Sequence, residues 1–284
     1  MPDHSQDIQR HYSHGNLLTR ILDALTASDK DIAAMKVDDL YGIDQMHIGG
    51  VMATRKLATR ASTCSDDKVL DVGCGIGGTS RLLASELGCR VTGIDLTEEY
   101  CRVAADLTDR TGLASLVRFQ AANALDTPFE NAHFTQIWCQ HINMNIADKE
   151  GLLREMARVL KPGGKLILHE IFSGDHQPIR YPVPWAPSES ISHLCSCQEY
   201  RDRLRALGLK ELYRHNHSDE ALSWWENRAK AIRNNNINAL GPQVIFGKSA
   251  PEFGPNLIHN LRSDAIRVFE MIWEKPSSTV NVNA

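Results

Sequence analysis

The chain has 284 residues, of which 42% are hydrophobic and 23% charged, and its formal net charge is −4. This length is sufficient for one large domain with a buried core, and no apolar run is long enough to span a bilayer. Basic and acidic residues are interleaved, which excludes the footprint of a nucleic-acid-binding protein and leaves a small molecule as the expected partner. Seven scattered cysteines predict free thiols in a reducing cytoplasm, and a homo-oligomer is compatible with these totals.

Residues 1–60 predict a mostly helical N-terminal cap, and strand and helix signals alternate after it. The expected strands are "KVLDVG", "RVTGIDL", "VRFQAA", "FTQIWCQ" and "KLILHEIF". The expected helices between them cover 78–88, 97–113 with Thr97 as N-cap, and 149–164, which Pro162 and a glycine pair stop. This alternation predicts a parallel sheet with helices on both faces.

The remaining segments have weaker signals. A proline-rich loop follows the fifth strand, and then a helix over 196–209 and a strand over 210–217. We expect a helical insertion at 218–262, a last, antiparallel core strand at 263–276 and a frayed tail at 277–284. The core then covers 61–217, and the fold class is α/β, with a Rossmann-like, mostly parallel sheet.

The stretch "VLDVGCGIGGTS" reads as a strand, a glycine turn and the start of a helix. Gly73, Gly75 and Gly78 fit the G-x-G-x-x-G spacing of dinucleotide-binding folds. Asp71 lies two residues before the first glycine, where its carboxylate would repel a pyrophosphate and attract an ammonium group. Asp95 ends the second strand and can accept hydrogen bonds from ribose hydroxyls. An adenosine ligand with a positive tail suits both acids, and S-adenosylmethionine is such a ligand.

Three motifs together resemble the class I S-adenosylmethionine-dependent methyltransferases: "LDVGCGIGG", "VTGIDL" and "ARVLKPGGKLIL". The resemblance covers about residues 45–174. It implies that Gly73, Gly75 and Gly77 pass close to the methionine part of the cofactor and that Asp95 binds its ribose. Where the family often has an Asp for the adenine amino group, this chain has Asn123, whose side-chain oxygen can also accept. The implied cofactor site further includes Leu96, Ala124 and Gln140.

The chain is most similar to the small-molecule branch of that family, which includes sarcosine/dimethylglycine, ubiquinone/menaquinone and tocopherol methyltransferases. "DQMHIGG", with His47, resembles the entry segment that lies over the cofactor in these enzymes, and "WCQHINMNIAD" resembles their acceptor-binding loop. The similarity implies an enzyme that methylates a small metabolite. Expected acceptor contacts are His47, Asn143, Asn145, Arg180, Tyr181 and Trp185.

His141 and Glu170 are the candidate catalytic residues. His141 could act as a base or as a hydrogen-bond donor, and Glu170, at the exit of the fifth strand, could act as a base. Nitrogen, oxygen and carbon remain open as the methylated atom. An amine acceptor of the sarcosine type would use Arg180 as its anion partner. A carbon acceptor of the prenyl diphosphate or quinone type would use Glu170 as base, and a non-catalytic S-adenosylmethionine-binding protein is the alternative class.

No metal site is expected from the sequence. Cys195 and Cys197 form a C-x-C pair without a second pair, which is poor zinc spacing. For a prenyl diphosphate acceptor, Asn143, Asn145 and Glu170 would help to hold magnesium. His215 and His217, with Trp224 and Trp225, are candidates for a lid, although a tryptophan pair is more often packed in a core.

Overall fold

The computed structural model describes residues 5–12, 15–176, 178–234 and 240–277, so most of the expected tail lies outside the described residues. Its centre is a seven-stranded sheet of order β3-β2-β1-β4-β5-β7-β6. β7 runs antiparallel to both of its neighbours, and the other pairs are parallel, as predicted. The strands are β1 (Lys68–Val72), β2 (Arg90–Asp95), β3 (Val117–Ala121), β4 (Phe134–Gln140), β5 (Leu160–Ser173), β6 (Lys210–Asn216) and β7 (Ile266–Glu274).

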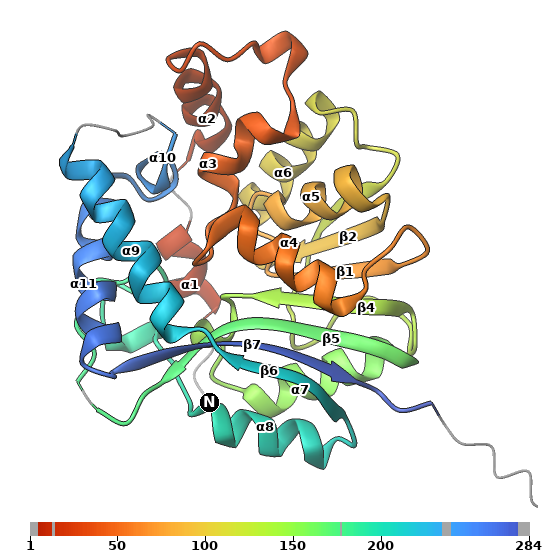
Figure 1. Cartoon of the computed structure of the whole chain (residues 1–284). Helices are drawn as coiled ribbons and strands as arrows, with labels where there is room; N and C mark the ends of the chain where they lie inside the picture. Colours follow the sequence, from red (N-terminus) through yellow and green to blue (C-terminus); the bar gives the residue numbers. More distant parts are fainter. Residues whose placement is uncertain (1–4, 13–14, 177, 235–239, 278–284) are drawn as a thin grey trace, which may run out of the picture.

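Helices cover both faces of the sheet (Figure 1). One face packs against α4 (Gly50–Ala61) and α5 (Gly78–Leu87), with α6 (Glu98–Arg110) beside them, and the other packs against α7 (Lys149–Val159) and α8 (Cys197–Ala206). Apolar residues in the strands alternate between these two layers, as the period of two in a strand requires. The core therefore lies on both sides of one sheet.

The N-terminal cap and the helical insertion pack on each other beside the sheet (Figure 1). The cap contains α1 (Ser5–Tyr12), α2 (Leu17–Thr26) and α3 (Tyr41–Asp44), and the insertion contains α9 (Ser218–Arg233), α10 (Pro242–Phe246) and α11 (Ala250–Arg262). Leucines of α2 share a buried cluster with Val244 and Ile245 of α10. Short 3₁₀ turns are η1 (Ile32–Ala34), η2 (Val37–Leu40), η3 (Asn143–Asn145), η4 (Glu189–Ile191) and η5 (Gly247–Ser249).

One local expectation was wrong. The predicted helix over 149–164 ends at Val159, and β5 already begins at Leu160, which pairs with Phe134. A register shift follows before Lys165, and such a bulge accommodates Pro162, which has no N–H for the ladder. Thr97 is the N-cap residue of α6, as predicted, although its side chain makes no capping hydrogen bond.

A buried ion pair fastens the cap to the core. Arg81 of α5 donates to Asp44 at 2.9 Å, and both side chains are fully buried. Arg81 also donates to the carbonyl oxygen of Ile76 at 2.7 Å. Gly78 allows this contact, because a Cβ there would lie 2.2 Å from the carbonyl oxygen of Asp44.

We predict that Asp44→Asn lowers the free energy of unfolding by about 3–5 kcal/mol, because it leaves the Arg81 charge buried without its partner. Urea unfolding measures the change. Glu86→Gln is the matched control: its pair with Arg55 is 2.6 Å long but partly exposed, so its loss should cost less than about 1 kcal/mol. Equal costs for the two variants would contradict this assignment.

Candidate active site

One large cavity, about 1450 Å³, extends from the glycine loop to the insertion. It is lined by residues that follow β1, β2, β3 and β4, by the cap and by α9 and α11. Among the expected site residues, Asp71, Gly73, Gly75, Asp95, Leu96, Asn123, Ala124, Gln140, His141, His47, Asn145 and Trp185 line it. Gly77, Asn143, Glu170, Arg180 and Tyr181 are not in its wall, contrary to expectation.

The glycine loop has a backbone that only glycine fits. Gly73 and Gly77 have φ of 67° and 86°, in the left-handed region. A Cβ on Gly73 would lie 2.1 Å from Cγ2 of Ile142, and one on Gly77 would lie 2.6 Å from the Phe119 ring. Gly77 therefore lies on the side of the loop that packs against Phe119, whereas Gly73 and Gly75 face the cavity.

Two carboxyl groups lie at this end of the cavity, that of Asp71 buried and that of Asp95 partly buried. Asp71 accepts a hydrogen bond from the Ser80 hydroxyl at 2.6 Å, and burial raises the pKa of Asp71 to about 7. Asp95 accepts from the backbone N–H of Gly75 at 3.0 Å and of Thr97 at 2.8 Å. Burial also raises the pKa of Asp95. Each carboxyl keeps free lone pairs, so both can bind further donors.

Two of the expected cofactor contacts already have partners within the chain. The side-chain oxygen of Asn123 accepts from the backbone N–H of Leu125 at 2.9 Å, which closes a turn. Gln140 accepts from the Thr79 hydroxyl at 2.7 Å. Both side chains are thereby held in the cavity wall, and the second lone pair of each oxygen can accept a ligand donor.

Glu170 lies under the loop that follows β4 and not in the cavity. Its carboxyl accepts from the backbone N–H groups of Ile142 and Asn143, each at 3.1 Å. Side chains alternate along β5, so Glu170 shares the α7–α8 face with Leu168 and Phe172, while His169 faces the other layer. Burial raises the pKa of Glu170 to about 8. The expectation that it opens into the crevice was therefore wrong.

His141 projects from the end of β4 and lines the cavity. Its φ is +56°, and its backbone N–H donates to the carbonyl oxygen of His169 at 2.9 Å. Its buried Nε2 has no hydrogen-bond partner in the part of the chain that the structure describes. Burial, and then the neighbouring His47 and His217, hold the pKa of His141 well below its ordinary value. The ring is therefore neutral near pH 7.

On the acceptor side, Asn145 donates to the carbonyl oxygen of Trp185 at 2.7 Å and fixes the proline-rich loop. Arg180 contacts α11 through its backbone: the backbone N–H of Arg180 donates to the side-chain oxygen of Asn260 at 2.8 Å. Sequence reasoning missed much of this wall, including Tyr12, Met46, Met144, Arg228, Phe246 and Phe253. For Arg228 a signal existed, because it lies four positions after Trp224 and so on the same helical face.

Comparisons with known proteins identify the family. A model described as "Methyltransferase domain" matches residues 70–168. O-methyltransferase resE of Aspergillus sclerotiorum is 30% identical over 62% of this chain and 67% of its own. Chloroplastic tocopherol O-methyltransferase of Arabidopsis thaliana is 32% identical over 56% of this chain and 48% of its own. The solved [4+2]-cyclase SpnF, at 21% identity, has a TM-score of 0.68 over 98% of this chain and 97% of its own.

This sheet order, with a glycine loop after β1 and an acid at the end of β2, defines a Rossmann-like nucleoside-binding fold. The chain belongs to the class I S-adenosylmethionine-dependent methyltransferases. It spans about half the length of the first relatives it matches, at 48% of each. Within the described residues, no helix is long and apolar enough to cross a membrane.

We predict that Glu170→Gln keeps kcat within about threefold, because the amide oxygen can still accept from the loop N–H groups and no base is lost from the cavity. Glu170→Leu should lower the free energy of unfolding by about 1–3 kcal/mol, because it leaves two buried donors without an acceptor. Steady-state kinetics and urea unfolding test both. A hundredfold loss of kcat in a stable Gln variant would restore Glu170 as a base.

Proposed function

We propose that the glycine-loop end of the cavity binds S-adenosylmethionine. Asp71 would accept from its amino group, and Asp95 from its ribose hydroxyls. Gly73 and Gly75 line this end of the cavity, which supports this placement. Leu96, Asn123, Ala124 and Gln140 would surround the adenine.

We propose that the enzyme transfers the methyl group to a hydroxyl oxygen of an apolar small molecule. The carrying observation is the place of His141 in the wall of the same cavity that receives the cofactor, with a neutral ring that can accept a proton. The acceptor end of that wall is mostly aromatic and aliphatic, with Met144, Trp185, Trp224, Trp225, Phe246 and Phe253. A planar apolar compound such as a phenol fits such a wall.

The chemistry requires little of the chain beyond positioning and one proton acceptor. Bound S-adenosylmethionine supplies a methyl group on a good sulfonium leaving group. His141 would accept the proton of the hydroxyl as its oxygen takes the methyl group, and the sulfur would leave as an uncharged thioether. The cap and the insertion exclude water, which strengthens the attraction between the nucleophile and the sulfonium charge.

Arg228 adds a charge preference to this acceptor. It lines the cavity, its guanidinium lies 5.6 Å over the Trp224 ring, and desolvation lowers its pKa. Among the described residues no carboxylate pairs with it. An acceptor with an acidic group would therefore be held with that group at Arg228. The amine and carbon alternatives lose support, because Arg180 and Glu170 lie outside the cavity.

The wider organisation is part of the proposal. We propose a cap at 1–60, a core at 61–217 and 263–276, and an insertion at 218–262 that encloses the acceptor together with the cap. The shared cluster of α2 and α10 supports this enclosure. The seven cysteines are free, which supports a reducing compartment such as the cytoplasm.

The Asp71 contact makes cofactor affinity depend on pH. Because its pKa is about 7, the carboxyl gains a proton as the pH falls from 8 to 6 and no longer attracts an ammonium group. We predict that Asp71→Asn raises the Kd for S-adenosylmethionine at pH 8 by about 10- to 100-fold and flattens its dependence on pH. Calorimetry measures both. Methylthioadenosine, which lacks the amino acid part, is the control, and an equal loss for it would contradict the contact.

We predict that His141→Asn lowers kcat for phenol acceptors by about 10²- to 10⁴-fold while the Kd for S-adenosylmethionine stays within about threefold. Asparagine tolerates the left-handed backbone at this position, so the loop should persist. Release of S-adenosylhomocysteine on a panel of phenols, amines and prenyl diphosphates provides the readout. His259→Asn, at an exposed helical site, is the control, and unchanged turnover of phenols in His141→Asn would refute the base.

A further inference from the structure

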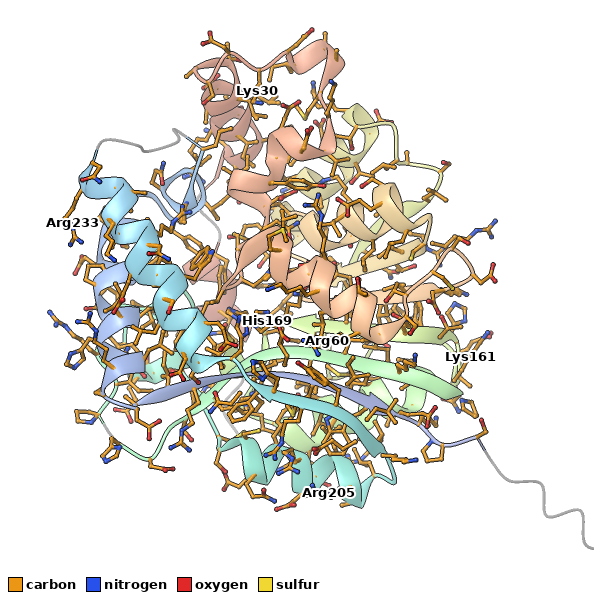
Figure 2. The ribbon with its side chains drawn as sticks, in the orientation of Figure 1. Lys30, Arg60, Lys161, His169, Arg205 and Arg233 are labelled. Carbon is orange, nitrogen blue, oxygen red and sulfur yellow. The ribbon has the colours of Figure 1, made fainter. Side chains whose placement is uncertain are left out.

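A cluster of histidines and one carboxyl group lies behind the His141 wall of the cavity. His169 is at its centre, with ring centroids 4.9 Å from His141, 5.7 Å from His47 and 5.6 Å from His217. In Figure 2, His169 lies near the middle of the molecule, between the sheet and the helices above it. Strand register brings Glu270 of β7 opposite His169 of β5, and cross-strand partners share a face.

The polar atoms of this cluster lack the partners that burial demands. His169 is fully buried, and neither of its ring nitrogens bonds to any group that the structure describes. Glu270 is 3% exposed, and its Oε1 is likewise without a hydrogen bond in the described part of the chain. The nearest approach, from Nδ1 of His217 to that oxygen, is 3.8 Å. Buried polar groups are normally satisfied, so these atoms indicate a missing partner.

We propose that His169, His217 and Glu270 bind a divalent transition-metal ion, with zinc as the reference ion. One ligand atom from each residue lies within 4.8 Å of the other two. Metal bonds of about 2.0–2.2 Å bring tetrahedral ligands to about 3.3–3.5 Å apart, so small side-chain rotations close the site. Two imidazoles and one carboxylate are a donor set typical of zinc or iron(II), with an open position for water.

The surroundings permit an ion to enter and be held. The His217 side chain is 12% exposed, which leaves an approach from outside, while the other two ligands are enclosed. His217 is fixed by its backbone N–H, which donates to the carbonyl oxygen of Val268 on β7 at 2.7 Å. An ion here would cross-link β5, β7 and the segment after β6. It would also hold the His169 ring against which His141 packs, so its role is to position the cavity wall.

A second possible group, His215, His217 and Glu220, shares His217 but is a weaker candidate. Nε2 of His215 already lies 2.8 Å from a Glu220 oxygen, and both side chains are exposed. The polar groups of His215 and Glu220 can therefore hydrogen-bond to each other and to solvent. The buried site could not be predicted from the sequence, because its residues are far apart in the chain and show no ligand spacing.

The test uses the full-length protein after treatment with a chelator and return of zinc. Metal analysis should find about one zinc per chain, and cobalt(II) should give the visible absorption of a low-symmetry site. His217→Ala and Glu270→Gln should each weaken zinc binding by at least about 100-fold and abolish the rise in Tm that zinc causes. The first variant changes a partly exposed residue, so the fold should survive it.

Three control variants separate this site from other histidines. His215→Ala, Glu220→Gln and His259→Ala should bind zinc as the unaltered chain does. Loss of zinc in His215→Ala or Glu220→Gln would move the site to the surface group and overturn the proposal. No stoichiometric zinc in the unaltered chain, or full binding by both folded His217→Ala and Glu270→Gln, would also overturn it.

Discussion

The position of β1 between β2 and β4 is the constraint on which the site depends. The chain leaves β1 toward one edge of the sheet and later returns to its other side, so a crevice opens at the carboxyl ends of these strands. Asp71, Asp95 and His141 come from three different strands and meet there because parallel strands end at one edge. Any change of strand order would disperse the carboxyl groups of the proposed cofactor site and the proposed base.

Side-chain alternation in β5 then divides two tasks between neighbouring residues. His169 faces the layer that holds the histidine cluster, and Glu170 faces the opposite layer, where it binds the loop after β4. Both act on His141, one through ring contact and a backbone bond, the other by fixing the next two residues. The proposed base is therefore positioned from both faces of a single strand, without either neighbour entering the cavity.

Much of the fold could be predicted because its signals are local. The alternation of strands with helices predicted the sheet and its antiparallel last strand. The glycine spacing and the acids at strand ends predicted the places of Asp71 and Asp95. The layer that Glu170 faces could not be predicted, because a polar residue near a strand end gives no indication of which layer packs beside it. The orientation of Arg180 could not be predicted either, because it lies in the irregular loop after β5. For Arg228 the spacing from Trp224 indicated a shared helical face. Where that face lies depends on how the insertion folds back, and this has no local signal.

The glycine motif itself shows why its spacing could not name the ligand. Gly73 is required by the approach of Ile142, and Gly78 by the approach of the carbonyl oxygen of Asp44. These demands come from the chain, so the G-x-G-x-x-G pattern records packing as well as ligand contact. The carboxyl groups are the better indication of the ligand, because a buried carboxylate at Asp71 favours a positively charged group. The same turn also receives the cap through Asp44, whose pair with Arg81 brings the cap against the loop that lines the cavity. One glycine turn therefore contacts both the cap and the proposed cofactor site.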